Sequence, residues 1–183
     1  MRPTEAKRYG YRLMGALGLL SASLLGHSSL AADLAAPGGK VDRAERISID
    51  GAVEHPRPLT LADLKGEPAT TEAVSLKTGK GVLTGSYTGV LLWTLLQQAV
   101  IKLPPGSKND AMRHTIVVTA SDGYTTVLSV AEIDPEFGDE QAIIAYAKDG
   151  QPLTDERGFA RLILPADKSA GRAISGVASI TVQ

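Results

Sequence analysis

The chain contains no cysteine among its 183 residues. It therefore cannot form a disulfide, a thiolate metal site, an iron–sulfur cluster or a C-x-x-C-H haem attachment, and it has no cysteine nucleophile. An excess of basic charge is also absent, because 19 Lys and Arg stand against 20 Asp and Glu. Neutralising a nucleic-acid backbone takes a basic surface, so nucleic acid is not an expected partner.

A hydrophobic run long enough for a comfortable membrane span is lacking as well. The apolar stretch at residues 13–25 follows Lys7, Arg8 and Arg12 and precedes the small residues Ser29 and Ala31. This order is typical of a secretory signal peptide, and it predicts cleavage after Ala31. An uncleaved membrane anchor is the alternative. Cleavage would leave 15 basic and 19 acidic residues.

We therefore expect three segments: a signal peptide at 1–31, a flexible leader at 32–46 and one folded domain at 47–183. The leader is rich in Ala, Gly and charged residues without an apolar period. The mature protein is expected to be periplasmic or secreted, with no membrane span.

Short strand patterns dominate the domain. Residues 114–119 and 124–128 are β-branched runs on either side of Asp122 and Gly123, which predicts a tight hairpin. Other strands are expected near residues 47–49, 74–76, 142–147, 160–164 and 174–182. One main buried helix is expected at residues 90–101, with Thr88 as its N-cap, and capping boxes at Thr60 and Ser129 predict two short helical turns. The predicted fold class is a compact, strand-rich α+β domain.

Several motifs resemble the molybdopterin-binding domain of sulfite-oxidase-type enzymes, and the resemblance extends from residue 47 to the end of the chain. The motifs, in order, are LTLADL at 59–64, YTGV at 87–90, DGY at 122–124, IAY at 144–146, DGQPL at 149–153, GF at 158–159, RLILP at 161–165 and GR at 171–172. The resemblance implies a sulfite-oxidase-like fold, which agrees with the strand-rich pattern.

The family binds molybdenum through one cysteine thiolate, and the corresponding position falls at or beside Lys77, where Leu76 and Thr78 are the neighbours. An amine or a hydroxyl does not replace a soft thiolate, so the oxygen-transfer chemistry of the family is not expected. The expected signal peptide has only Lys7 and Arg8 at the place where the export signal of a folded, cofactor-loaded protein has twin arginines. From both observations we expect no bound cofactor, or molybdopterin if the domain binds it without a cysteine.

The family also holds the pterin phosphate with a histidine, an arginine and a lysine. The resemblance places Arg161 at the arginine position, Arg157 at the histidine position and Ser175 at the lysine position. Arg157, Arg161 and Arg172 are therefore predicted to converge on a pocket for an anion. The alternative is that Arg157 and Arg172 only make surface ion pairs.

No other constellation in the sequence indicates catalysis. The glycine-rich segment 79–89 matches neither a phosphate-binding loop nor a nucleophile elbow. Two function classes remain. The first is a non-catalytic exported binding or accessory protein, whose partner is a small anion or a redox protein. The second is a component of a molybdopterin-dependent oxidoreductase that binds cofactor without a cysteine ligand.

Overall fold

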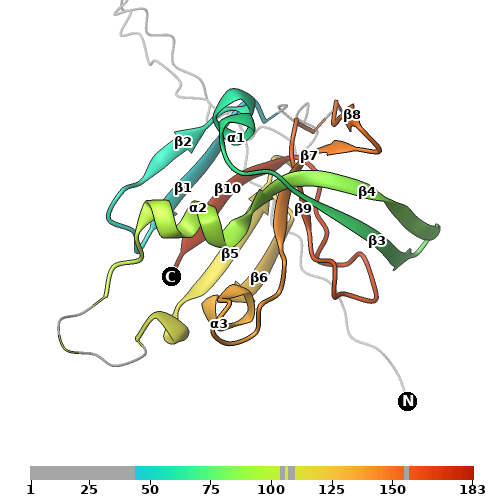
Figure 1. Cartoon of the computed structure of the whole chain (residues 1–183). Helices are drawn as coiled ribbons and strands as arrows, with labels where there is room; N and C mark the ends of the chain where they lie inside the picture. Colours follow the sequence, from blue (N-terminus) through green and yellow to red (C-terminus); the bar gives the residue numbers. More distant parts are fainter. Residues whose placement is uncertain (1–43, 104–105, 107–109, 155–156) are drawn as a thin grey trace, which may run out of the picture. The chain divides into compact units, whose positions relative to one another are not determined.

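Two five-stranded β-sheets form the framework of the computed structural model, which describes residues 44–103, 106, 110–154 and 157–183. The first sheet has the order β2-β1-β10-β5-β6. Its strands are β1 (Ile47–Gly51), β2 (Arg57–Leu59), β5 (Thr115–Ala120), β6 (Thr125–Ser129) and β10 (Val177–Val182). β1 and β10 run parallel, with Ser48 opposite Ser179, and the other neighbours are antiparallel. The last strand of the chain thus lies in the middle of this sheet (Figure 1).

The second sheet is built on a long hairpin. Its strands are β3 (Thr70–Thr78), β4 (Gly81–Leu91), β7 (Ile143–Lys148), β8 (Gln151–Pro152) and β9 (Arg161–Ile163). β7 pairs with β4, and both β8 and β9 pair with β7. The β3–β4 hairpin extends well beyond the rest of its sheet (Figure 1).

The hairpin predicted around Asp122 and Gly123 is confirmed. β5 and β6 pair antiparallel from Thr115 opposite Ser129 to Thr119 opposite Thr125. Gly123 adopts a φ of 82°, and the Asp122 side chain accepts a hydrogen bond from the backbone N–H of Tyr124 at 3.0 Å. The turn therefore forms because both residues suit its backbone, as the sequence indicated.

The expected main helix is present but shorter. It is α2 (Leu92–Ala99), and its first turn has no side-chain cap, because Leu91 occupies the N-cap position. The prediction that Thr88 caps this helix is wrong, since β4 continues through Thr88 to Leu91 and pairs with β7, with a register shift between Thr88 and Gly89. The two capping boxes are confirmed: Thr60 opens α1 (Leu61–Gly66) and Ser129 opens α3 (Val130–Ile133). One 3₁₀ turn, η1 (Asp110–Arg113), precedes β5.

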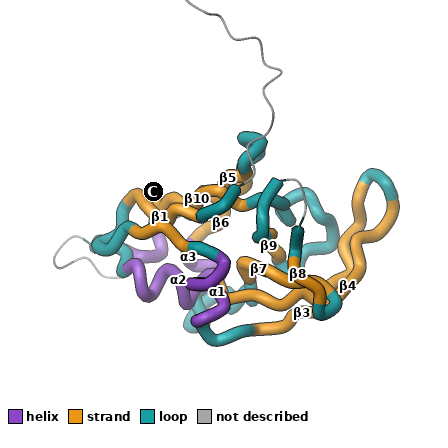
Figure 2. The backbone as a smooth tube through the Cα atoms, turned by 90° about the horizontal axis from the view of Figure 1, so that it is seen from above, coloured by secondary structure: helices purple, strands orange, loops and turns teal. Residues whose placement is uncertain are grey.

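The main core lies between α2 and the first sheet. Leu92, Leu95 and Leu96 of α2 are fully buried and belong to one cluster with Ile49 of β1 and Ile180 of β10. The helices gather on one side, away from the tip of the β3–β4 hairpin (Figure 2). A smaller cluster on the second sheet includes Val74, Leu76, Tyr87, Ile143, Ala145 and Ile163. This arrangement confirms the strand-rich α+β class with one main buried helix.

None of the helices in the described part of the chain has the length and apolar character needed to cross a membrane.

Candidate functional site

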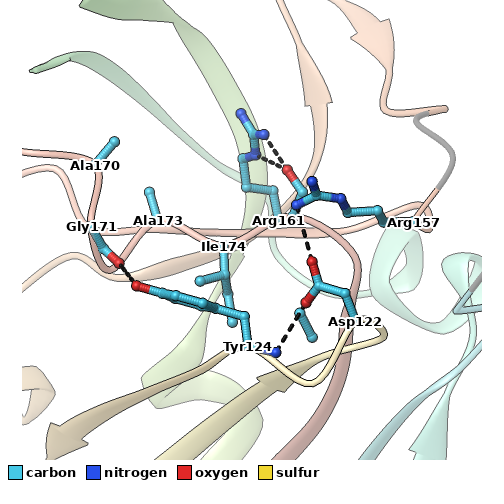
Figure 3. A pocket seen from close by; sticks show the side chains of 10 residues that line it. Asp122, Tyr124, Arg157, Arg161, Ala170, Gly171, Ala173 and Ile174 are labelled. Atoms are coloured by element: carbon cyan, nitrogen blue, oxygen red, sulfur yellow. Dashed lines mark hydrogen bonds and ion pairs between the residues drawn. The ribbon is translucent and has the colours of Figure 1, made fainter. Parts of the chain in front are cut away.

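Two of the three predicted arginines line one open pocket of about 410 Å³. Its walls come from three parts of the chain: the β5–β6 turn, the segment that leads into β9, and residues 170–175. Figure 3 shows the Arg157 and Arg161 side chains close together in this pocket, with Asp122 joined to Arg157 by an ion pair and the Tyr124 hydroxyl directed toward Gly171. We call it the arginine pocket.

Arg161 is held in place by hydroxyl groups. Its Nε donates to the Ser175 Oγ at 2.7 Å, its Nη2 also donates to that oxygen, and its Nη1 donates to the Tyr87 hydroxyl at 3.3 Å. Within the described residues, no carboxylate lies within ion-pair distance of Arg161. The partly buried guanidinium is thus oriented, and none of the described carboxylates forms an ion pair with it.

Arg157 is more exposed and lies against the β5–β6 turn. Its Nη1 is 3.3 Å from the Asp122 Oδ2, and its backbone carbonyl accepts from the Ser121 hydroxyl at 2.9 Å. Gly176 makes this approach possible. It has a φ of 70°, and a Cβ there would lie 2.4 Å from the Arg157 Cβ.

A second open groove, of about 580 Å³, shares Arg157 and Arg161 with the arginine pocket. Its other wall is the tip of the β3–β4 hairpin, including Lys77, Thr78 and Lys80. The position that resembles the family's thiolate ligand is therefore next to the two arginines, although 80 residues or more separate them in sequence. At this position Lys77 supplies an amine and Thr78 a hydroxyl.

The structure does not bring Arg172 to this site. Arg172 donates from Nε and Nη2 to Asp167 at 3.1 and 2.7 Å, and from Nη1 to Glu132 at 3.0 Å. The hydrogen bonds with Asp167, and then that with Glu132, hold the pKa of Arg172 above its usual value despite partial burial. The expected convergence of three arginines is therefore reduced to two. Arg172 instead anchors the loop that carries Ala170 and Gly171 to the pocket.

Sequence reasoning placed Ser175 at the family's lysine position, but it missed the contacts by which three residues contribute to the site. Tyr87 and Ser175 orient Arg161, and Asp122 pairs with Arg157. Asp122 and Tyr87 stood in motifs that had been noted, but their role depends on contacts between distant segments, which no local pattern encodes. In the described residues, no group of three or more His, Asp or Glu side chains is placed to hold a metal ion.

Comparison with known proteins identifies the class. The sequence model of the oxidoreductase molybdopterin-binding domain family matches residues 36–183, and the chain belongs to this family. The uncharacterized oxidoreductase YuiH of Bacillus subtilis is 29% identical over 115 residues, which cover 62% of this chain and 52% of the relative. The chain thus spans about half the length of this curated relative.

The fold also resembles a solved structure, the sulfane dehydrogenase SoxCD from Paracoccus pantotrophus. The TM-score is 0.61 at 21% identity, over 79% of this chain and 39% of that chain. At this identity the likeness concerns the fold alone. It confirms the sulfite-oxidase-like architecture.

Family membership overturns the expectation of no cofactor. The family is defined by molybdopterin binding, so molybdopterin is the cofactor indicated for this domain. The arginine pocket fits the phosphate end of such a cofactor, because Arg161 is oriented there without a carboxylate partner among the described residues. The metal end does not fit the cysteine-ligated arrangement, because the chain has no thiolate to offer.

Proposed function

We propose that this chain is an exported protein that binds a molybdopterin-type ligand through its phosphate, and that it is a non-catalytic binding or accessory protein. The family supplies the ligand class. The single observation that carries the binding mode is Arg161, a partly buried guanidinium held by Ser175 and Tyr87 at the edge of an open pocket. A phosphate oxygen is the partner that such a guanidinium binds most strongly.

The non-catalytic role follows from the residues at the hairpin tip. Lys77 and Thr78 line the groove that continues from the arginine pocket, at the position where the family's thiolate is expected. A protonated amine repels a metal cation, and a neutral hydroxyl is a weak, hard ligand compared with a thiolate. The chain's own residues therefore do not rebuild the family's metal centre.

Export rests on the amino-terminal pattern of basic residues, an apolar stretch and the small residues Ser29 and Ala31. In the periplasm or outside the cell, the partner would be a small anionic ligand or a redox protein. These assignments are supported by sequence alone.

The alternative function is a component of a molybdopterin-dependent oxidoreductase that binds the cofactor without a cysteine ligand. Family membership favours it, and so does the groove itself, which is large enough to extend from Arg161 to Lys80. In that case another protein or a solvent-derived group would complete the metal's ligands.

The binding proposal is tested with protein purified from its native host and with Arg161→Gln. Released pterin is measured by the fluorescence of its oxidised form, and phosphate binding by calorimetry with methyl phosphate. We expect pterin in the wild type, and its loss together with at least a tenfold weaker methyl phosphate affinity in the variant. Arg113→Gln is the matched control, because Arg113 is an exposed arginine remote from the pocket lining. Equal binding by wild type and Arg161→Gln would overturn the proposal.

An activity assay on the cofactor-loaded protein distinguishes the two proposed functions. If it reduces or oxidises an artificial electron mediator when offered sulfur oxyanions, the non-catalytic role is wrong and the alternative holds. X-ray absorption adds an independent readout. Any molybdenum present is expected to lack a cysteinyl sulfur ligand, since the chain has none to give.

A further inference from the structure

We propose that Asp122 is an internal counter-ion that competes with a bound phosphate for Arg157, and so sets how strongly the arginine pocket favours doubly charged phosphates. This inference rests on the proposed function, because it concerns the same pocket. It assigns a role to a carboxylate that lines an anion site, where a negative charge would ordinarily weaken binding.

The position of Asp122 is fixed by its turn. One carboxylate oxygen accepts the backbone N–H of Tyr124 at 3.0 Å, and the other lies 3.3 Å from the Arg157 Nη1. Two hydrogen bonds also hold the β5–β6 turn against its neighbours. The Ser121 hydroxyl donates to the Arg157 carbonyl at 2.9 Å, and the Ser121 N–H donates to the Gly176 carbonyl at 2.8 Å. Asp122 therefore stays beside Arg157 whether or not a ligand is present.

The two arginines consequently differ in what they offer an anion. Arg161 is oriented by neutral hydroxyls and has no carboxylate beside it among the described residues, whereas Arg157 faces Asp122. An incoming phosphate binds Arg161 without displacing any carboxylate of the described residues. To reach Arg157 it must share that guanidinium with Asp122 and accept the repulsion of the carboxylate. Figure 3 shows this arrangement, in which the Asp122 carboxylate is directed from the β5–β6 turn toward Arg157.

The repulsion scales with the charge of the ligand, which makes the role measurable. A carboxylate that lies about 5–6 Å from the bound anion in a water-exposed site weakens a monoanion about threefold and a dianion about tenfold. Removing the charge of Asp122 should therefore help a phosphate monoester more than a phosphate diester.

The test uses Asp122→Asn, which keeps an oxygen to accept the Tyr124 N–H and creates an Asn–Gly turn that suits the same backbone. Affinities are measured by calorimetry at pH 8, where methyl phosphate is doubly charged and dimethyl phosphate singly charged. We expect the variant to bind methyl phosphate about tenfold more tightly and dimethyl phosphate about threefold more tightly. Glu54→Gln, which removes an exposed carboxylate from the loop after β1, is the control for net charge.

The same substitution in an Arg157→Gln background completes a double-mutant cycle. If Asp122 also acts through competition for Arg157, the gain from Asp122→Asn should be smaller there, because only the direct repulsion of the ligand remains. Unchanged affinities, equal gains for both esters, or a full gain without Arg157 would each overturn the role of Asp122. Methyl phosphate binding that is absent from both the wild type and Asp122→Asn would instead overturn the proposed function, and this role with it.

Discussion

Gly176 determines, at the scale of a single residue, whether Arg157 can lie beside the pocket. Its φ of 70° is in the left-handed region, and its missing side chain leaves room for the Arg157 backbone. A Cβ would lie 2.4 Å from the Arg157 Cβ and 2.7 Å from its carbonyl oxygen. Both the conformation and the contact therefore require glycine.

We expect Gly176→Ala to lower the free energy of unfolding by about 3 kcal/mol, of which about 1 kcal/mol is the cost of a left-handed alanine. Gly150→Ala is a matched control. Gly150 has a φ of 75°, but a Cβ there meets nothing within 4 Å, so it should cost only the conformational part. Urea unfolding measures both. Equal losses in the two variants would show that the Arg157 contact contributes nothing.

Glu140 is a second residue whose surroundings affect the free energy of unfolding. Partial burial raises the pKa of its carboxyl, and the hydrogen bond that it accepts from the Ala166 N–H at 3.2 Å only partly opposes this. The folded state thus holds this proton more tightly than the unfolded state. Stability contributed by the protonated carboxyl is present at low pH and is lost as pH rises through the raised pKa.

Glu140→Gln keeps an oxygen acceptor for Ala166 and removes the charge. Relative to wild type, the variant is expected to gain stability as pH rises through the Glu140 pKa, with no gain at lower pH where the carboxyl is protonated. Urea unfolding across pH 3.5 to 8 checks this, and Glu136→Gln controls for removing one charge from the same loop. A gain that is constant across pH would contradict the assignment.

Arg161 shows what residue-scale reasoning from sequence can and cannot reach. Its place in the RLILP motif was enough to nominate it, because the resemblance is local in sequence. Its partners were not predictable in the same way. Ser175 and Tyr87 lie 14 and 74 residues away. Tyr87 reaches Arg161 through the second sheet, and Ser175 through an isolated bridge to β9, so only the folded chain brings them together.

At the scale of elements, the loop between β9 and β10 is held by charged and hydrogen-bonding groups as well as by apolar contacts, because Ala170 and Ala173 pack against the smaller core cluster. Arg172 pairs with Asp167 inside the loop and with Glu132 on α3, while the Tyr124 hydroxyl donates to the Gly171 carbonyl at 2.8 Å. Lys77 of β3 adds two backbone hydrogen bonds, with Lys168 and Ala170. The pocket wall formed by Ala170 and Gly171 is thus fixed from three sides.

We expect Arg172→Gln to destabilise the protein by about 1–2 kcal/mol, since it leaves two partly buried carboxylates without their cation. Amide hydrogen exchange should accelerate most at residues 166–173, and methyl phosphate should bind more weakly because the wall moves. Arg113→Gln, which removes a much more exposed guanidinium that lies 3.4 Å from Asp110, should cost less than about 0.5 kcal/mol. Unaltered exchange in the loop would show that the backbone contacts suffice without Arg172.

Elements with strong local signals were predictable. The β5–β6 hairpin and the capping boxes of α1 and α3 depend on residues within a few positions of one another, and all three formed as expected. The start of α2 was misplaced because two preferences competed. Thr88 suits a helix N-cap, but pairing with β7 keeps it in β4. Tertiary pairing overrode the local preference.

The whole molecule was predictable in class but not in topology. The strand-rich class and the single main buried helix followed from the pattern of apolar residues, although β2, β4 and β8 were not expected. The parallel pairing of β1 with β10 joins residues about 130 positions apart. The presence of the arginine pocket depends on that topology, since its walls come from segments spread between residues 120 and 175. Such an arrangement leaves no local trace in the sequence.

Export can be checked on the intact chain. The basic residues, apolar stretch and small residues at the amino terminus predict removal of residues 1–31. The intact mass of protein recovered from the periplasm or medium should therefore correspond to residues 32–183. Recovery of full-length protein from the membrane fraction would replace cleavage with an amino-terminal anchor.

The central place of β10 also determines when the first sheet can form during synthesis. β10 lies between β1 and β5, and it joins the β1–β2 pair to the β5–β6 hairpin. The first sheet, with the core between it and α2, can therefore close only after the β10 segment has been made, however early the two antiparallel pairs form. The wall of the arginine pocket at residues 170–175 directly precedes β10 in the chain, so a ligand of this pocket is bound only late in the synthesis of the domain.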